Sequence, residues 1–204
     1  PNRLLVQAVA AIVHAMPSAL PLLLAYLGYA ITLSFALSRA GFRANIAPAN
    51  SPDSSAPNRI LILGATGGTG RALLAQALER GLHVTVLVRN PARLKVEHPR
   101  LRVITGDVLD PSAVAEAMRG QEAVLSALGH KRFLGPSRIL SQGTRNLLQA
   151  MEAAGARRFV CETSLGIGDS SGRLGLLYTL FTIPVILPFY FWDKTRQERS
   201  IAAS

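Results

Sequence analysis

The chain has 204 residues, of which 49% are hydrophobic and 17% charged, a composition that allows one α/β domain and an additional segment. Its 22 basic residues outnumber the 12 acidic ones, yet the arginines are scattered along the chain and form no basic stripe, which argues against nucleic-acid binding. The single cysteine, Cys161, excludes an intrachain disulfide, and the four histidines form no metal-binding constellation. We therefore expect neither nucleic acid nor a metal ion as a ligand.

The first 43 residues form an apolar segment. No Asp, Glu, Lys or Arg occurs from Leu4 to Ser38, and a bilayer core needs only about 20 apolar residues in a helix. Pro17 and Pro21 interrupt this run, so Leu22 to Ser38 is the better candidate for a transmembrane helix. We expect residues 1–43 to be a helical membrane anchor. The alternatives are a hairpin, an interfacial helix, a helix packed on a partner, and a signal peptide.

Residues 44–58 are rich in Pro, Ser, Asn and Ala and show no hydrophobic period, which is typical of a linker. A second domain is therefore expected from Arg59 to Ser204. Arg39 and Arg43 follow the apolar segment, whereas Arg3 alone precedes it. The positive-inside rule then predicts that this second domain lies in the cytoplasm.

A glycine-rich loop follows the first apolar run of this domain. The run Arg59 to Leu63 predicts a buried strand, and a helical pattern begins at Arg71 and ends at Gly81. Between them, glycines at the spacing G-x-x-G-x-x-G allow a tight turn, a close approach of backbone to a pyrophosphate, and close packing of helix on strand. The partial positive charge of the helix N-terminus favours phosphate there. The residues of this predicted dinucleotide loop are Gly64, Thr66, Gly67, Gly68, Thr69 and Gly70.

Strands and helices alternate after the loop. Apolar, β-branched runs predict four more strands, and helical patterns with capping residues separate them. Such βαβ alternation predicts an α/β fold, a Rossmann-type doubly wound parallel sheet with its ligand crevice at the carboxyl ends of the strands. The predicted strands are His83–Arg89, Leu101–Asp107, Glu122–Gly129 and Arg158–Ser164, and the predicted helices are Pro111–Arg119, capped by Asp110, and Pro136–Ala154, closed by Gly155.

Arginines stand where the second ribose of a dinucleotide would bind. In such folds, a carboxylate about 20 residues after the glycine loop selects NAD, whereas an arginine accepts the 2′-phosphate of NADP. Arg89 occupies this position, Arg93 follows one helical turn later, and no carboxylate lies between Glu79 and Glu97. We predict NADP(H) as the cofactor, with NAD(H) less favoured. The remaining predicted cofactor-binding residues, at the ends of the third and fourth strands, are Asp107, Ser126, Ala127, Leu128 and Gly129.

Four motifs carry a family resemblance: Gly64 to Arg71, Leu87 to Pro91, Gly106 to Asp110 and Thr163 to Ser170. Together they resemble the atypical short-chain dehydrogenases/reductases, in the NAD(P)H-binding group that includes flavin reductase and biliverdin-IXβ reductase. The resemblance covers about Arg59 to Ser204 and implies a Rossmann domain with a nicotinamide cofactor. Because the family usually continues for one more strand, the domain is expected to be truncated at its C-terminus.

The resemblance also implies catalytic residues. Short-chain reductases use a strand-end serine, a tyrosine, and a lysine four residues after it, which Ser164, Tyr190 and Lys194 match. In this family the tyrosine gives a proton to the carbonyl oxygen as hydride arrives, the lysine holds the nicotinamide ribose, and the serine orients the substrate. Residues at i and i+4 face the same side of a helix. The alternative is that Tyr190 is a core aromatic and hydride goes to a flavin-like acceptor.

These features predict a membrane-associated NADP(H)-dependent oxidoreductase that reduces a small hydrophobic carbonyl or a flavin-like or quinone-like acceptor. The alternatives are a non-catalytic NADP(H)-binding subunit or redox sensor of a membrane assembly, with protein partners, and, less favoured, a sugar-nucleotide epimerase.

A second charge-free run, Leu174 to Trp192, contains Pro184 and Pro188, which argue against a membrane span. We interpret this run as a hydrophobic lid over the substrate, able to rest on a bilayer.

Overall fold

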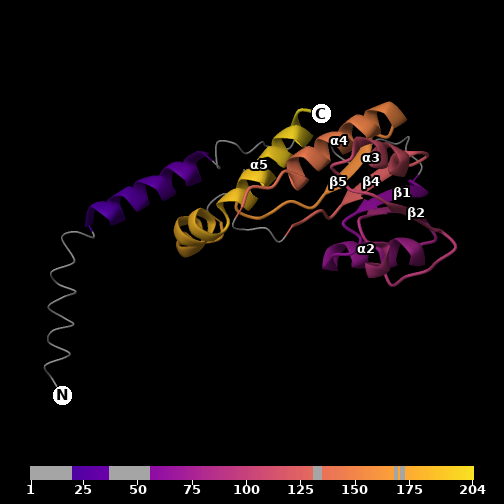
Figure 1. Ribbon diagram of the computed structural model, residues 1–204, viewed down its shortest axis with the longest axis horizontal. Coiled ribbons are helices and arrows are strands. Elements are labelled where there is room, and N and C mark those ends of the chain that lie inside the picture. Colours follow the sequence, from indigo (N-terminus) through magenta and orange to yellow (C-terminus); the bar gives the residue numbers. More distant parts are fainter. Residues whose placement is uncertain (1–19, 37–55, 131–134, 168–169, 171–172) are drawn as a thin grey trace, which may run out of the picture.

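The computed structural model describes residues 20–36, 56–130, 135–167, 170 and 173–204 (Figure 1). Five parallel strands form one sheet in the order β3-β2-β1-β4-β5. This order reverses direction next to β1, as in a Rossmann fold. The strands are β1 (Arg59–Leu63), β2 (His83–Val88), β3 (Leu101–Thr105), β4 (Ala123–Ser126) and β5 (Arg158–Cys161).

Helices cover both faces of the sheet, so the predicted doubly wound architecture is confirmed. Alternate residues of β1 point to opposite faces. Ile60 and Ile62 pack with Leu74 of α2 (Gly68–Glu79) on one face. Leu61 and Leu63 belong to the core on the other face, beneath α3 (Pro111–Met118) and α4 (Ile139–Ala154). Figure 1 shows α2 on one side of the strands and α3 and α4 on the other.

The predicted strands after β1 all end earlier in the structure than the sequence suggests. β2 ends one residue early, before Arg89, and β5 ends at Cys161 rather than Ser164. At this edge the backbone leaves the ladder and forms loops, because the residues there line a crevice instead of pairing with a neighbouring strand. The predicted site residues of these segments therefore lie on loops at the carboxyl ends of the strands.

The helix ends follow their capping residues. Asp110 accepts a hydrogen bond from the amide of Ser112 at 2.9 Å, and thereby caps α3 as predicted. Gly155, with a φ of +70°, closes α4 as predicted. The start of α4 lies at Ile139, three residues after the predicted start, because a carboxylate from a distant helix caps it there. That carboxylate belongs to Asp193 of α5 (Pro188–Ala202), which packs along α4.

An N-terminal helix, residues 20–36, packs against η3 (Tyr178–Ile186), a π-helix that precedes α5. One stripe of this N-terminal helix is buried or half-buried, at Tyr26, Leu27, Ala30, Leu33 and Ser34. Leu33 packs against a small core cluster that η3 and α5 share with the loop after β5. Two charge-free parts of the sequence therefore lie side by side, although some 150 residues separate them.

The structure does not support the transmembrane helix that the sequence predicts. Among the described residues, no helix has both the length and the apolar character needed to cross a membrane. Residues 1–19 and 37–55, which contain much of the predicted anchor and of the predicted linker, lie outside the described part of the chain. The second charge-free run is divided at Leu187 between η3 and α5.

Candidate active site

The glycine loop is held tightly between β1, β4 and α2. Gly64 has a φ of +79°, and a Cβ there would lie 2.2 Å from the carbonyl oxygen of Ala127. A Cβ on Gly70 would lie 2.1 Å from the carbonyl oxygen of Gly64. Gly68, by contrast, has open space on its Cβ side. The loop thus packs closely against its own sheet at the first and third glycines and leaves room for a ligand at the middle of the loop.

A pocket of about 620 Å³ opens beside this loop at the carboxyl ends of the strands. It is large enough for part of a dinucleotide. The loops after β1, β2, β3 and β4 all contribute to it, and it contains most of the predicted cofactor-binding residues. The predicted residues that line it are Gly64, Thr66, Gly67, Arg89, Arg93, Asp107, Ala127, Leu128 and Gly129.

Arg89 and Arg93 lie together on the loop after β2. The side chain of Asn90 accepts a hydrogen bond from the amide of Ala92 at 3.1 Å and caps the short helix η1 (Pro91–Arg93). The guanidinium of Arg71, on α2, donates to the backbone carbonyl of Arg93 at 3.2 Å. This loop is therefore tied to the helix that follows the glycine loop, and both predicted arginines are exposed at the pocket.

Asp107 lies at the crevice, whereas Ser126 is buried beside it. Asp107 lines the pocket, and its carboxylate also accepts a hydrogen bond from the amide of Leu109 at 3.0 Å, which fixes the turn after β3. Ser126 is the last residue of β4 and is 2% exposed. It lines none of the pockets described for this edge of the sheet, whereas the next three residues line two of them.

The three predicted catalytic residues meet in a second pocket of about 300 Å³. Ser164 comes from the loop after β5, and Tyr190 and Lys194 come from the first two turns of α5. The glycine loop, including Gly68, Thr69 and Gly70, forms another wall of this pocket. The two pockets share four lining residues, which are Gly67, Ala127, Leu128 and Gly129. Together the pockets therefore form one crevice along the glycine loop.

Lys194 is almost fully buried beside the end of β5. Its Nζ donates a hydrogen bond to the backbone carbonyl of Glu162 at 2.8 Å, and the residue is 2% exposed. Burial lowers the pKa of Lys194, while neighbouring Cys161 and Glu162 act in the opposite direction. Through its hydrogen bond to Glu162, the lysine fixes the loop that carries Ser164. Burial also raises the pKa of the neighbouring Cys161 thiol, whose sulfur lies 3.4 Å from the amide nitrogen of Gln197.

Sequence reasoning missed His130, which lines this crevice, and Asp193, which is buried behind it. His130 follows Gly129 directly and lines the larger pocket. Its ring makes an edge contact with the ring of Tyr190, with centroids 5.1 Å apart, and its Nε2 lies 3.9 Å from the carboxylate of Asp193. The position of His130 directly after a strand-end glycine is the signal that could have identified it. The role of Asp193 depends on a contact across 53 residues, which no local pattern indicates.

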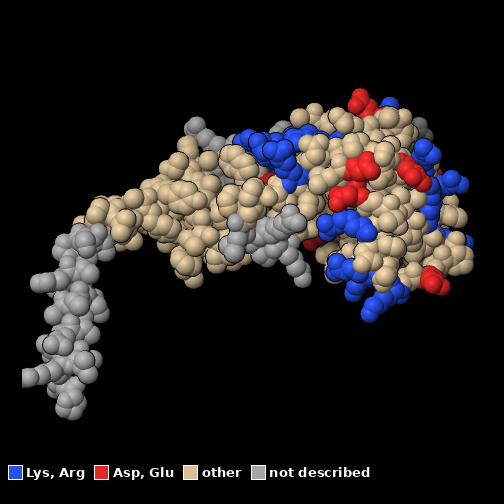
Figure 2. Space-filling model, in the orientation of Figure 1, with Lys and Arg blue, Asp and Glu red and all other residues tan. Residues whose placement is uncertain are grey.

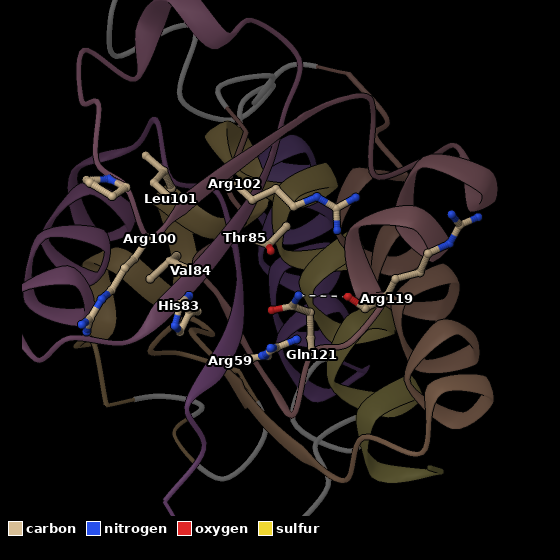
Figure 3. A pocket seen from close by; sticks show the side chains of 10 residues that line it. Arg59, His83, Val84, Thr85, Arg100, Leu101, Arg102, Arg119 and Gln121 are labelled. Atoms are coloured by element: carbon tan, nitrogen blue, oxygen red, sulfur yellow. Dashed lines mark hydrogen bonds between the residues drawn. The ribbon is translucent and has the colours of Figure 1, made fainter.

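Another pocket lies at the opposite, amino-terminal edge of the sheet (Figure 3). It has a volume of about 290 Å³ and is lined by basic side chains, among them Arg59, Arg102 and Arg119. Gln121 there donates a hydrogen bond to the carbonyl oxygen of Arg119 at 3.1 Å. The glycine loop and the predicted catalytic residues lie at the other end of the strands, so this pocket is separate from the candidate active site.

Comparison with protein families identifies one matching model, described as NAD(P)H-binding, which covers residues 64–204. A 3β-hydroxysteroid dehydrogenase/Δ5→4-isomerase of Mycobacterium tuberculosis is 31% identical over 52% of this chain and 31% of its own length. A 3-diazoavenalumate denitrifying reductase of a Streptomyces species is 34% identical over 52% of this chain and 37% of its own length. The chain thus spans about a third of the length of these two relatives.

Solved structures share the fold. ChuY, an anaerobillin reductase from Escherichia coli O157:H7, is 26% identical, with a TM-score of 0.56 over 70% of this chain and 66% of its own. A short-chain dehydrogenase/reductase from Veillonella parvula in complex with NADP has a TM-score of 0.55 over 72% of this chain and 64% of its own. At 22% identity, the second structure supports the likeness of the fold alone.

Proposed function

Because the chain belongs to the NAD(P)H-binding family, we propose that it is an NADP(H)-dependent oxidoreductase of the atypical short-chain type. One observation carries this proposal. Ser164, Tyr190 and Lys194, drawn from two separate elements, line the same pocket as the glycine loop. A serine, a tyrosine and a lysine that meet at a dinucleotide loop are the groups needed to bind and protonate a substrate oxygen.

The residues of the crevice fit a dinucleotide. Gly68 leaves the middle of the loop open to a pyrophosphate, and α2 begins there with its positive end. Arg89 and Arg93 would hold a 2′-phosphate, since a guanidinium matches phosphate geometry and charge. Ala127 to Gly129 would lie beside the cofactor where the two pockets join. Bound NADPH supplies a hydride.

The protein side of the reaction is a proton transfer. The hydroxyl of Ser164 binds the substrate oxygen, and the hydroxyl of Tyr190 gives that oxygen a proton. Lys194 holds the loop after β5 through the carbonyl of Glu162 and so positions Ser164. His130 packs its ring edge against the Tyr190 ring and restricts its orientation. With a flavin-like or quinone-like acceptor, solvent can supply the proton instead.

We further propose that the acceptor is small and hydrophobic and that the enzyme works at a membrane, with its nucleotide domain on the cytoplasmic side. The charge-free run that begins at Leu174 leads directly into the helix that carries Tyr190, which places apolar surface next to the catalytic pocket. The cytoplasm is also where the NADPH pool is available. These two considerations support the proposal.

The experiment follows NADPH oxidation by its absorbance with three acceptors: flavin mononucleotide, a short-chain ubiquinone analogue and an aromatic aldehyde. With the aldehyde, Tyr190→Phe should lower kcat by on the order of 10²-fold or more, because the proton donor is lost. With the flavin or the quinone, the same variant should change turnover little.

Calorimetry of NADPH binding to the same samples separates a binding defect from a catalytic one. NADPH binding without turnover on any acceptor would favour the alternative, a non-catalytic NADP(H)-binding subunit or redox sensor. Failure of NADPH to bind would contradict the proposal altogether.

A further inference from the structure

The N-terminal helix and residues 174–187, which include η3, form an apolar arm. Figure 1 shows the two segments side by side at one end of the molecule, away from the sheet. Neither segment contains Asp, Glu, Lys or Arg, and in Figure 2 this arm carries neither blue nor red atoms. The charged side chains of the face in view are gathered on the nucleotide domain.

Hydroxyl groups of the N-terminal helix form hydrogen bonds with backbone carbonyls of η3 and so join the two segments of the apolar arm. Pro184 has no N–H, so within η3 it cannot donate the hydrogen bond that a π-turn would direct from this position to the carbonyl of Thr179. The hydroxyl of Tyr26 donates to the carbonyl of Leu180, and that of Ser34 lies 3.4 Å from the carbonyl of Thr179. The hydroxyl of Ser34 thus lies near the carbonyl that loses its donor to the proline, and the hydroxyl of Tyr26 bonds the next carbonyl along η3.

Three further hydroxyls of the apolar arm are bonded inside it. Pro188 likewise removes the amide that an α-turn would direct at Pro184, whose carbonyl accepts from the hydroxyl of Tyr29 at 3.3 Å. Thr32 donates to the carbonyl of Gly28 at 2.7 Å. Thr179 donates to the carbonyl of Gly175 at 2.9 Å. These bonds satisfy hydroxyls and carbonyls within the arm, which lowers the cost of covering it with an apolar phase.

The outer surface of the apolar arm consists of large exposed hydrophobic side chains. A cluster of this size is uncommon on a water-exposed surface. Leu22 is 74% exposed, and Leu176 and Leu177 are 79% and 78% exposed. The other exposed hydrophobic residues of the arm are Leu20, Leu23, Leu24, Tyr29, Ile31, Phe35, Tyr178, Phe181, Val185 and Ile186.

Basic residues border the apolar arm where it meets the domain. Arg173 directly precedes the arm, and Arg196 follows it on α5 with its guanidinium 5.7 Å from the centroid of the Trp192 ring. In Figure 2, blue atoms lie where the tan arm joins the domain. A charge-free surface bordered by arginine and tryptophan matches the profile of a lipid interface, where anionic headgroups lie above the acyl chains.

We propose that the apolar arm docks into the surface of an anionic bilayer, with its exposed leucines among the acyl chains and the border arginines at the headgroups. The occupant is lipid rather than a second copy of this chain, because the arginine border complements anionic headgroups and would be repelled by a second arginine-bordered arm. The inference builds on the membrane location proposed above and does not depend on turnover.

The test is flotation of the 204-residue chain with vesicles of phosphatidylcholine, and of phosphatidylcholine with about 30% phosphatidylglycerol. The wild type should float with the anionic vesicles, and the fluorescence of Trp192, the single tryptophan, should shift to shorter wavelength. The double variant Leu176→Glu, Leu177→Glu should bind at least about tenfold more weakly. The control, Val96→Glu with Val103→Glu, changes two exposed apolar residues of the nucleotide domain and should bind as the wild type does.

Circular dichroism of all three proteins verifies that the variants are folded. Vesicle binding by a protein that fails to bind or oxidise NADPH would contradict only the proposed function. Three results would overturn the inference: no flotation of the wild type, equal flotation of the two double variants, or a wild-type dimer in sedimentation velocity that the arm variant alone dissociates.

Discussion

The carboxylate of Asp193 on α5 accepts hydrogen bonds from both the backbone amide and the hydroxyl of Ser141 at the start of α4. It also accepts from the amide of Leu140 at 3.0 Å. Asp193 is 1% exposed, so a helix from the end of the chain caps the N-terminus of another across 52 residues. The same carboxylate lies 3.9 Å from Nε2 of His130, which lines the crevice. Folding of the C-terminal helix and order in the crevice are thereby coupled.

Asp193→Asn should lower the free energy of unfolding by about 2–3 kcal/mol, because an amide replaces a buried charged acceptor of three hydrogen bonds. Urea unfolding followed by circular dichroism measures the loss. Asp110→Asn is the matched control, since Asp110 caps α3 in solvent and its replacement should cost less. Equal losses for the two variants would mean that the Asp193 contacts add nothing beyond an ordinary cap.

Two glycines of the loop should respond differently to alanine. Gly70→Ala places a Cβ against the backbone of Gly64 and should destabilise the fold, whereas Gly68→Ala meets no protein atom within 4 Å. Gly68→Ala should therefore unfold at the midpoint of the wild type or slightly above it, because alanine is favoured over glycine in a helix. It should nevertheless bind NADPH about tenfold more weakly, because the methyl group occupies space for the pyrophosphate. Thermal unfolding and calorimetry report the two quantities. Full NADPH affinity in Gly68→Ala would place the pyrophosphate elsewhere.

The parts of the molecule that could be predicted from the sequence are those with local signals. The strand before Gly64, the helix after it and the caps Asp110 and Gly155 all depend on residues a few positions apart, and each is confirmed. The parallel, doubly wound sheet followed from βαβ alternation, because parallel strands require crossover helices. The crevice could be predicted for the same reason, since strand ends of one sheet must meet at one edge.

The remaining features depend on contacts between distant segments. Hydropathy alone cannot distinguish a membrane span from a helix that packs on another apolar segment, and the pairing of Tyr26 with Leu180 became evident only in three dimensions. The cap that Asp193 provides for α4 is equally non-local. His130 was missed for another reason, because a lone histidine after a strand carries little information until its neighbours Tyr190 and Asp193 are known.

Arg89→Asp should shift cofactor preference from NADPH toward NADH. A carboxylate at this position repels a 2′-phosphate and accepts a hydrogen bond from a 2′-hydroxyl. We expect NADPH affinity to fall by at least about tenfold while NADH affinity is kept or rises, as measured by calorimetry. Arg119→Asp, at the opposite edge of the sheet, introduces the same charge change and should leave the preference as it is. A preference that moves equally in both variants would reflect net charge rather than a 2′-phosphate site.

Lys194 should make the stability of the protein depend on pH. Burial lowers its folded-state pKa below the ordinary value of 10.5. Below the folded pKa both states hold the proton, and the folded state bears the full cost of a buried ammonium. As pH rises from the folded pKa toward 10.5, the unfolded state binds more protons than the folded state, so this group adds stability with increasing pH. Cys161 acts in the opposite direction, because its raised pKa reduces stability as pH rises above 9.0.

Because Lys194 and Cys161 interact electrostatically, the lysine contribution is measured by comparing Cys161→Ser with the double variant Cys161→Ser, Lys194→Met, neither of which has a titrating thiol. The unfolding free energy of Cys161→Ser relative to the double variant should increase as pH rises toward 10.5, because the penalty of the buried ammonium disappears where Lys194 is present and is absent from the double variant throughout. Urea unfolding at several pH values measures the difference. A difference that stays constant over this range would mean that Lys194 keeps an ordinary pKa in the folded protein, and that its hydrogen bond to Glu162 offsets the burial of its charge.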